Sequence, residues 1–248
     1  LARFYDLDHA SVRADVEMYR QFAAQSGSPI LELGCGTGRI ALPLARDGHE
    51  VAAVDISPAM LAVLRAKLAQ EPPDVAARVQ VVQADMRHLA LGGEFALAIC
   101  PLNTFMHMTT QADQLAALGG AYRHLAPGGR LIVDVASPLA LLLLPTGEAL
   151  SLQSELRDAA SGRTVQKFTS MRLDHARQMQ YITLIYDEVG ADGVVRRSTL
   201  RTELRYVFRF EMQLLLERVG FTVEDVYGSP DLEPYEALSE NMIFVARR

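Results

Sequence analysis

The sequence predicts a doubly wound α/β fold with a small antiparallel sheet inserted into it. Short apolar runs alternate with amphipathic helical stretches over residues 30–135, an order typical of a parallel sheet with helices on both faces. The same order resumes in residues 209–248, after a region of alternating polar and apolar residues. We therefore expect one domain made of residues 1–137 and 209–248, with residues 138–208 inserted as an antiparallel sheet.

The first predicted strand leads into a loop with a glycine at every second position. Residues 30–45 are ILELGCGTGRIALPLA, in which Gly34, Gly36 and Gly38 stand between a strand and a helix. Without a Cβ, glycine accepts positive φ and lets a ligand approach the backbone at a helix N-terminus. The dinucleotide fingerprint would need glycine where Arg39 stands, and no Gly-Lys-Ser/Thr follows as in a Walker loop. The loop predicts a small-molecule site of another kind.

The later α/β elements carry their own start and stop signals. The helix after the glycine loop ends at Gly48, and the second strand ends in Asp55. Ser57 is a predicted N-cap, with Pro58 at the first helical position. The same signals predict strands at 51–54, 79–82, 95–99, 130–135, 221–226 and 242–246, and helices at 60–68, 113–125 and 211–219.

Residues 151–208 follow a different pattern. The stretches TVQKFTSMRL, QMQYITLIYDEV and VVRRSTLRTELRYVF alternate polar and apolar residues. Hairpin-type turn residues at Ser161-Gly162 and at 191–193 separate them. We expect a small antiparallel sheet that stands over the carboxyl ends of the main strands.

Five motifs lie in a fixed order on these elements: Glu32, the glycine loop, Asp55, Asp85 in VVQADM, and 127–129 in LAPGGRLIVDV. In this order and placement, residues 30–135 resemble the class I S-adenosylmethionine-dependent methyltransferases. The closing segments RFEMQLLLERVGFTVEDVYG and MIFVARR are similar to the last helix and final strand pair of that family. The resemblance implies a Rossmann-like, mostly parallel sheet with an antiparallel final strand.

The resemblance also implies an activity. It predicts a methyltransferase of the small-molecule branch, similar to amino-sugar and glycine-type N-methyltransferases, that uses S-adenosylmethionine and leaves S-adenosylhomocysteine. The methyl group would move to a nitrogen or oxygen by in-line displacement. Alignment of donor and acceptor is then the main contribution of the protein, about 7 to 11 kcal/mol in favourable cases.

A set of cofactor-binding residues follows from the same resemblance. An acid at the end of the second strand, Asp55, can accept both ribose hydroxyls, and Asp85 with Met86 would meet the adenine. Tyr5, in the segment FYDLDHA, would face the methionine part, because aromatic faces attract a sulfonium; alternatively, it only anchors the terminus. The expected cofactor-binding residues are Tyr5, Glu32, Gly34, Cys35, Gly36, Gly38, Asp55, Ile56, Asp85, Met86 and Pro101.

His107 is the candidate catalytic residue. It lies in the loop CPLNTFMHMT, which leaves the sheet at the carboxyl end of strand 95–99. An acceptor amine must lose a proton, and a hydroxyl acceptor needs a general base. In small-molecule N-methyltransferases of the family, a histidine in a similar loop lies near the acceptor. The alternative is that His107 caps the next helix or fills a gap in the core.

Composition limits the partners. A formal net charge of -6 disfavours a phosphate backbone, so we expect a small-molecule acceptor and no nucleic acid. The two cysteines lack the spacing of a metal site or of a disulfide framework, which predicts no metal, reduced thiols and a cytoplasmic location. No apolar run approaches the ~18 to 20 residues of a membrane helix. Insertions at this place in the family build a substrate lid or a dimer contact, so a homodimer is possible.

Three other functions compete with methyl transfer to a small molecule. A nicotinamide-dependent oxidoreductase is disfavoured by Arg39 and by the absence of a Tyr-x-x-x-Lys pair. A nucleic-acid methyltransferase is disfavoured because residues 100–103 are Cys-Pro-Leu-Asn, where a base-flipping amino-methylase carries Asn/Asp-Pro-Pro-Tyr/Phe. A cofactor-binding protein without transferase activity remains the third alternative.

Overall fold

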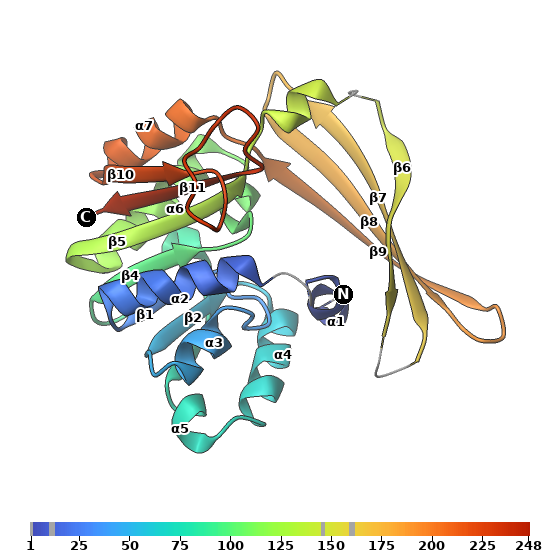
Figure 1. Ribbon diagram of the computed structural model, residues 1–248, viewed down its shortest axis with the longest axis horizontal. Helices are drawn as coiled ribbons and strands as arrows, with labels where there is room; N and C mark the ends of the chain where they lie inside the picture. Colours follow the sequence, from blue (N-terminus) through green and yellow to red (C-terminus); the bar gives the residue numbers. More distant parts are fainter. Residues whose placement is uncertain (1, 10–12, 145–146, 159–161) are drawn as a thin grey trace.

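The computed structural model describes residues 2–9, 13–144, 147–158 and 162–248, and it has an α/β layer beside a separate curved sheet (Figure 1). The strands of the α/β layer are β1 (Ile30–Leu33), β2 (Val51–Asp55), β3 (Val79–Gln83), β4 (Phe95–Cys100), β5 (Leu125–Ala136), β10 (Thr222–Tyr227) and β11 (Asn241–Arg247). They form one sheet in the order β10-β11-β5-β4-β1-β2-β3. Neighbouring strands are parallel, except that β11 runs antiparallel to both β5 and β10. The predicted doubly wound sheet with an antiparallel final strand is confirmed.

Helices cover both faces of this sheet, so its central strands are buried. One face packs against α2 (Ala14–Ser26), α3 (Ala41–Arg46), α4 (Pro58–Leu68) and α5 (Pro73–Ala76). The other face packs against α6 (Gln111–His124) and α7 (Arg209–Val219). Along β1 the side chains alternate between the two layers, because Ile30 belongs to the first and Leu31 and Leu33 to the second.

The start and stop signals explain most of the element boundaries. The Ser57 hydroxyl caps α4 as expected, by accepting from the Met60 N–H, and Gly220 ends α7 with φ +114°. Helix α6 begins at Gln111, earlier than predicted, because Thr110 supplies the cap. Strand β5 also begins early, at Leu125, and its pairing with β4 shifts register where the Pro-Gly-Gly segment bulges.

The inserted region forms its own sheet. Strands β6 (Ala149–Arg157), β7 (Thr164–Asp174), β8 (Met179–Val189) and β9 (Val195–Arg205) pair antiparallel in sequence order. The turn expected at residues 191–193 joins β8 to β9, where Gly193 has φ +78°. Of the other expected turn, Ser161 lies outside the described residues. Between β5 and β6 the chain passes through the short 3₁₀ helix η3 (Ala140–Leu143).

Helix α1 (Ala2–Asp8) lies between the α/β layer and the inserted sheet (Figure 1). The Phe4 ring stacks on Tyr186 of β8 with 4.5 Å between centroids, and Asp8 forms an ion pair with Lys167 of β7. On the opposite side Asp6 accepts from the Lys67 ammonium of α4 at 2.8 Å. One short helix thus joins the inserted sheet to the main layer.

Helices α1 and α2 have no counterpart among the elements predicted from the sequence. Met18, Tyr19, Phe22 and Ala23 of α2 are buried at helical spacing, but acidic and basic residues between them weaken the pattern. In the described part of the chain, no helix combines the length and the apolar character needed to cross a membrane.

Candidate active site

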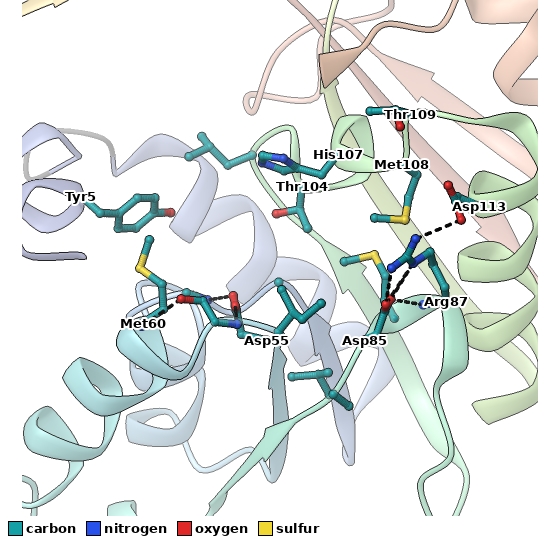
Figure 2. Close-up of a pocket in the computed structure, with 18 residues that line it drawn as sticks. Tyr5, Asp55, Met60, Asp85, Arg87, Thr104, His107, Met108, Thr109 and Asp113 are labelled. Atoms are coloured by element: carbon teal, nitrogen blue, oxygen red, sulfur yellow. Dashed lines mark hydrogen bonds and ion pairs between the residues drawn. The ribbon is translucent and has the colours of Figure 1, made fainter. Parts of the chain in front are cut away.

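A cavity of about 470 Å³ opens at the carboxyl ends of β1 to β4. Figure 2 shows Asp55 and Asp85 along one side, His107 and Thr104 opposite them, and Tyr5 at one end. The short 3₁₀ helices η1 (Met86–His88) and η2 (Thr104–His107) contribute to its wall. It is lined by Tyr5, Gly34, Gly36, Val54, Asp55, Ile56, Ser57, Met60, Ala84, Asp85, Met86, Arg87, Leu102, Thr104, His107, Met108, Thr109 and Asp113.

The glycine loop needs its glycines for two different reasons. Gly34 has φ +72°, and a Cβ there would lie 2.2 Å from Cγ2 of Thr104. Gly36 has φ +55°, and a Cβ there would lie 3.8 Å from the Tyr5 ring. Gly38 instead allows close packing on Leu64 and does not line the cavity. Gly34 and Gly36 therefore present bare backbone to the cavity.

Asp55, at the end of β2, is held by two backbone N–H groups. Gly36 donates to Oδ2 at 2.8 Å, and Ser57 donates to Oδ1 at 2.8 Å. A carboxylate oxygen has two lone pairs, so each oxygen keeps an acceptor position for a further donor. Asp55 therefore offers two fixed, adjacent acceptors, the arrangement that a ribose diol requires.

Asp85 is bound to Arg87 of η1. Arg87 Nη2 donates to Asp85 Oδ2 at 2.6 Å, while Nη1 donates to Asp113 Oδ1 at 3.2 Å (Figure 2). The hydrogen bonds from Arg87 hold the pKa of the Asp85 carboxyl below its usual range. Asp85, the expected acceptor for the adenine amino group, thus lies in the cavity. Its carboxylate is already bonded to the guanidinium of Arg87, a residue that was not predicted from the sequence.

Tyr5 is fixed above the glycine loop by Arg39. The Arg39 guanidinium donates to the Tyr5 hydroxyl and forms a two-pronged ion pair with Asp15 of α2, at 2.8 and 2.5 Å. Burial raises the pKa of Tyr5, and Arg39 opposes that effect. Tyr5 is therefore a neutral, oriented aromatic ring in the cavity wall.

Glu32 lies behind the glycine loop and does not line the cavity. Its side chain is buried, with the residue 2% exposed, and Oε2 has no hydrogen-bond partner among the described residues. Burial raises the pKa of Glu32 to about 8; the Arg39 charge opposes that rise and the Asp55 charge adds to it. Glu32 therefore carries a proton at neutral pH and leaves one buried oxygen unpaired.

The structure divides the expected cofactor residues into two groups. Tyr5, Gly34, Gly36, Asp55, Ile56, Asp85 and Met86 line the cavity. The others, Glu32, Cys35, Gly38 and Pro101, are buried beside it and do not line it. Burial also raises the pKa of the Cys35 thiol, so this side chain is a neutral packing group.

His107 ends η2 and lines the cavity with part of its side chain exposed. Desolvation by the surrounding wall lowers the pKa of His107 below the usual value, and the charge of Asp55 opposes the shift. The imidazole is therefore neutral at pH 7. His107 does not cap α6, because Thr110 occupies that position.

Several cavity residues were missed by sequence reasoning. Thr104 and Arg87 enter the wall through contacts with Gly34 and Asp113, which are far away in the chain. Met60 lies on the first turn of α4, directly after the capped start of the helix. Its position shortly after Asp55, the acid at the end of β2, is a sequence signal that could have identified it.

The cavity fits an adenosyl ligand. Asp55 supplies paired acceptors, Gly34 and Gly36 supply a backbone cradle, and the unpaired Oε2 of Glu32 lies behind that cradle. The apolar walls include Val54, Ala84 and Leu102, which suit a flat base.

Comparisons with known proteins agree with this geometry. A family model described as a methyltransferase domain matches residues 30–129. The cypemycin N-terminal methyltransferase of a Streptomyces species is 30% identical over 222 residues, covering 90% of this chain and 84% of that enzyme. The solved CcbJ methyltransferase of Streptomyces caelestis superposes with a TM-score of 0.82 at 25% identity, covering 96% of this chain and 97% of its own.

A second solved structure has S-adenosylmethionine bound. CalS10, an amino pentose methyltransferase of Micromonospora echinaspora, has a TM-score of 0.71 at 25% identity, covering 98% of this chain and 91% of its own. All the proteins named here are methyltransferases, so an oxidoreductase gains no support.

Proposed function

This chain belongs to the class I S-adenosylmethionine-dependent methyltransferases, and we propose that it methylates an amine nitrogen of a small molecule. The observation that carries the choice of nitrogen is the acidic lining of the cavity, in which Asp55, Asp85 and Asp113 accompany one lining arginine, Arg87. Amines are protonated at neutral pH, and a protonated amine has no lone pair with which to attack a methyl carbon. A neutral imidazole can accept that proton, which makes His107 the proposed general base.

Two of the compared enzymes support an amine acceptor. The cypemycin enzyme is named for an N-terminus and CalS10 for an amino pentose. In the cavity of this chain, Asp55, Asp85 and Asp113 outnumber the single lining arginine, Arg87. A cavity with this charge balance favours a cationic amine over an anionic acceptor.

The proposed cofactor site uses residues of the cavity and the layer behind it. S-adenosylmethionine, when bound, supplies a methyl group made electrophilic by its sulfonium. Asp55 would hold the ribose hydroxyls and Asp85 the adenine amino group, and Glu32 would support the glycine loop from behind. Tyr5 would place its ring against the sulfonium. The remaining cavity-lining residues predicted from the sequence, Gly34, Gly36, Ile56 and Met86, would complete the surface, with Cys35, Gly38 and Pro101 packed behind it.

We also propose that residues 138–208 form a lid over the acceptor. Helix α1 contacts the inserted sheet through Phe4 and the glycine loop through Tyr5. The sheet is thereby tied to the wall of the cavity. The other surface of β6 exposes Leu150 and Leu152, 59% and 54% accessible, which supports a homodimer through that side.

The location of the protein is proposed from its cysteines. Cys35 and Cys100 are both buried and unpaired, which suits the reducing cytoplasm.

The activity test separates nitrogen from oxygen as the acceptor. The protein is incubated with methyl-labelled S-adenosylmethionine and a panel of amino sugars and peptide N-termini, each paired with its hydroxyl analogue. We expect label on amines, and a His107→Gln variant that binds S-adenosylhomocysteine normally but is slow. Label only on hydroxyl compounds, or on none of the panel, would overturn the proposed acceptor.

A further inference from the structure

We infer that Asp134 is a positioning residue for methyl transfer, which acts through a left-handed turn at Leu102 and Asn103. Its own side chain does not line the cavity, and the inference rests on the proposed active site. Asp134 belongs to β5, whose neighbour β4 leads into this turn. The residue is 2% exposed, so its carboxylate is a buried charge that needs an explanation.

The turn is held by Asp134 with both its side chain and its backbone. The Leu102 N–H donates to the Asp134 carboxylate, and the Asn103 N–H donates to the Asp134 carbonyl oxygen at 3.0 Å. The Asn241 side chain of β11 donates from Nδ2 to Asp134 Oδ1 at 3.0 Å. Three donors from two different segments therefore converge on one residue.

The turn needs this support because of its backbone conformation. Leu102 has φ +48° and Asn103 has φ +64°, two successive non-glycine residues in the left-handed region. A side chain with a Cβ rarely adopts this conformation, least of all a leucine. A strained backbone persists only where surrounding bonds over-determine it. Besides the bonds to Asp134, Asn103 Oδ1 accepts from the Ala136 N–H at 2.5 Å.

The turn leads directly into the catalytic wall of the cavity. Leu102 itself lines the cavity, and η2 starts at the next residue after Asn103. Thr104 then packs over Gly34, and His107 ends the same short helix (Figure 2). A rotation of the turn would move the candidate base relative to the glycine loop. Because in-line transfer depends on alignment, small displacements there reduce the rate.

A carboxylate suits this position better than an amide. Burial raises the pKa of Asp134, while the donors Asn241 and Leu102 lower it, so the charge is stabilised by hydrogen bonds. In Asp134→Asn alone, one of the two carboxylate oxygens becomes an NH₂ group, which cannot accept from Asn241 Nδ2 or from the Leu102 N–H. Exchanging the two side chains avoids that conflict, because an aspartate at position 241 accepts from the amide at position 134.

The experiment therefore compares Asp134→Asn with the exchange Asp134→Asn/Asn241→Asp. We expect Asp134→Asn to lower kcat at least tenfold while the Kd for S-adenosylhomocysteine changes less than threefold. The exchange should return kcat to within threefold of wild type. Glu224→Gln is the matched control, because Glu224 pairs with Arg130 and Arg247 elsewhere on the sheet and should keep the wild-type kcat.

A second readout needs no acceptor. The His107 ring is titrated by NMR, with His107→Gln used to assign its signal. In Asp134→Asn we expect the pKa of His107 to move toward the free-imidazole value, and in the exchange to return to the wild-type value. If Asp134→Asn does not fold, Asn103→Gly replaces it. Glycine keeps the left-handed φ but removes the acceptor for the Ala136 N–H, so the same losses are expected.

The outcomes separate this inference from the proposed function. A wild-type kcat and an unmoved His107 titration in Asp134→Asn overturn the positioning role, as does a folded exchange variant that stays slow. A wild-type protein that methylates no amine overturns the proposed acceptor class instead. In that case the His107 titration still decides the role of Asp134.

Discussion

Arg87 forms two hydrogen bonds with Asp85 inside the cavity. Arg87 Nη2 lies 2.6 Å from Asp85 Oδ2, and Arg87 Nε lies 3.0 Å from Asp85 Oδ1. Asp113 holds the other end of the same guanidinium. An adenine amino group that donates to Asp85 must therefore share it with Arg87. The guanidinium, in turn, offers donors at the place where the edge of the purine is expected.

Replacing Arg87 should change which purine is preferred. In Arg87→Met, only a carboxylate would face position 6 of the base, so we expect at least a tenfold rise in the preference for S-adenosylhomocysteine over S-inosylhomocysteine. Stability should change little, because the ion pair is partly exposed. Calorimetry of both ligands checks this, with Arg78→Met as a control at another arginine–aspartate pair. An unchanged preference would show that Asp85 does not contact the base.

Removing the carboxylate of Asp55 should weaken cofactor binding. Asp55→Ala is expected to cost about 1.5 to 3 kcal/mol of S-adenosylhomocysteine affinity, the range for hydrogen bonds to charged groups. Titration calorimetry measures the loss, and Asp74→Ala serves as the control because Asp74 lies in α5, away from the cavity. An affinity equal to that of the Asp74→Ala control would show that Asp55 does not bind the cofactor.

The rate should depend on pH through His107. The base must be neutral, and the lowered pKa of His107 places the loss of activity below about pH 6.5, the usual imidazole value. We expect kcat to fall as pH drops through that lower value. In His107→Gln, kcat should be about 10²-fold to 10⁴-fold lower, and this acidic limb should disappear. If kcat of the variant still falls at acidic pH, that fall is caused by the titration of another group.

Gly34 and Thr104 should be coupled in stability. Gly34→Ala adds a Cβ that would lie 2.2 Å from Thr104 Cγ2, at φ +72°. We expect a loss of about 1 to 3 kcal/mol from the contact, and about 1 to 2 kcal/mol more from the left-handed backbone. In Gly34→Ala/Thr104→Ala, denaturant unfolding should recover the first part only. Equal stabilities of the single and double variants would contradict the packing explanation.

Much of this fold followed from local patterns. Strands such as β1 and β2 lie between two helical layers, so each is an almost continuous apolar run, and the acid of Asp55 marks the end of β2. Helix α2 escaped prediction because its apolar stripe is narrow and the rest of it faces solvent. The early start of β5 was not predicted, because a Pro-Gly-Gly segment is a turn signal. In the structure this segment belongs to the strand, where the pairing with β4 is bulged.

The residues of the cavity also include some that local sequence patterns predict and some that they do not. Gly34, Gly36 and Asp55 were predictable because a strand, a turn and a helix start fix their geometry within a few residues. Arg87 and Leu102 were not, because one depends on Asp113 of α6 and the other on Asp134 of β5. Sequence spacing carries no information on such contacts between distant segments.

Glu32 should make the stability of the protein depend on pH. Its pKa is about 8 in the folded chain against 4.5 for a free carboxyl, so between these values only the folded state keeps the proton. Wild-type stability should therefore fall as pH rises from about 4.5 to 8. We expect the Tm of Glu32→Gln, relative to wild type, to increase between pH 5 and pH 8.5. The exposed Glu50→Gln is the control, and parallel Tm profiles would show that Glu32 is charged throughout.

Helix α1 has a consequence for turnover. Its Tyr5 lies over Gly36 while its Phe4 is stacked on Tyr186, so we expect release of product from the glycine loop to be coupled to the position of this seven-residue helix. The residence time of the product would then depend on an aromatic stack between α1 and the inserted sheet. An engineer who wants faster cycling would loosen that stack and leave the chemical groups untouched.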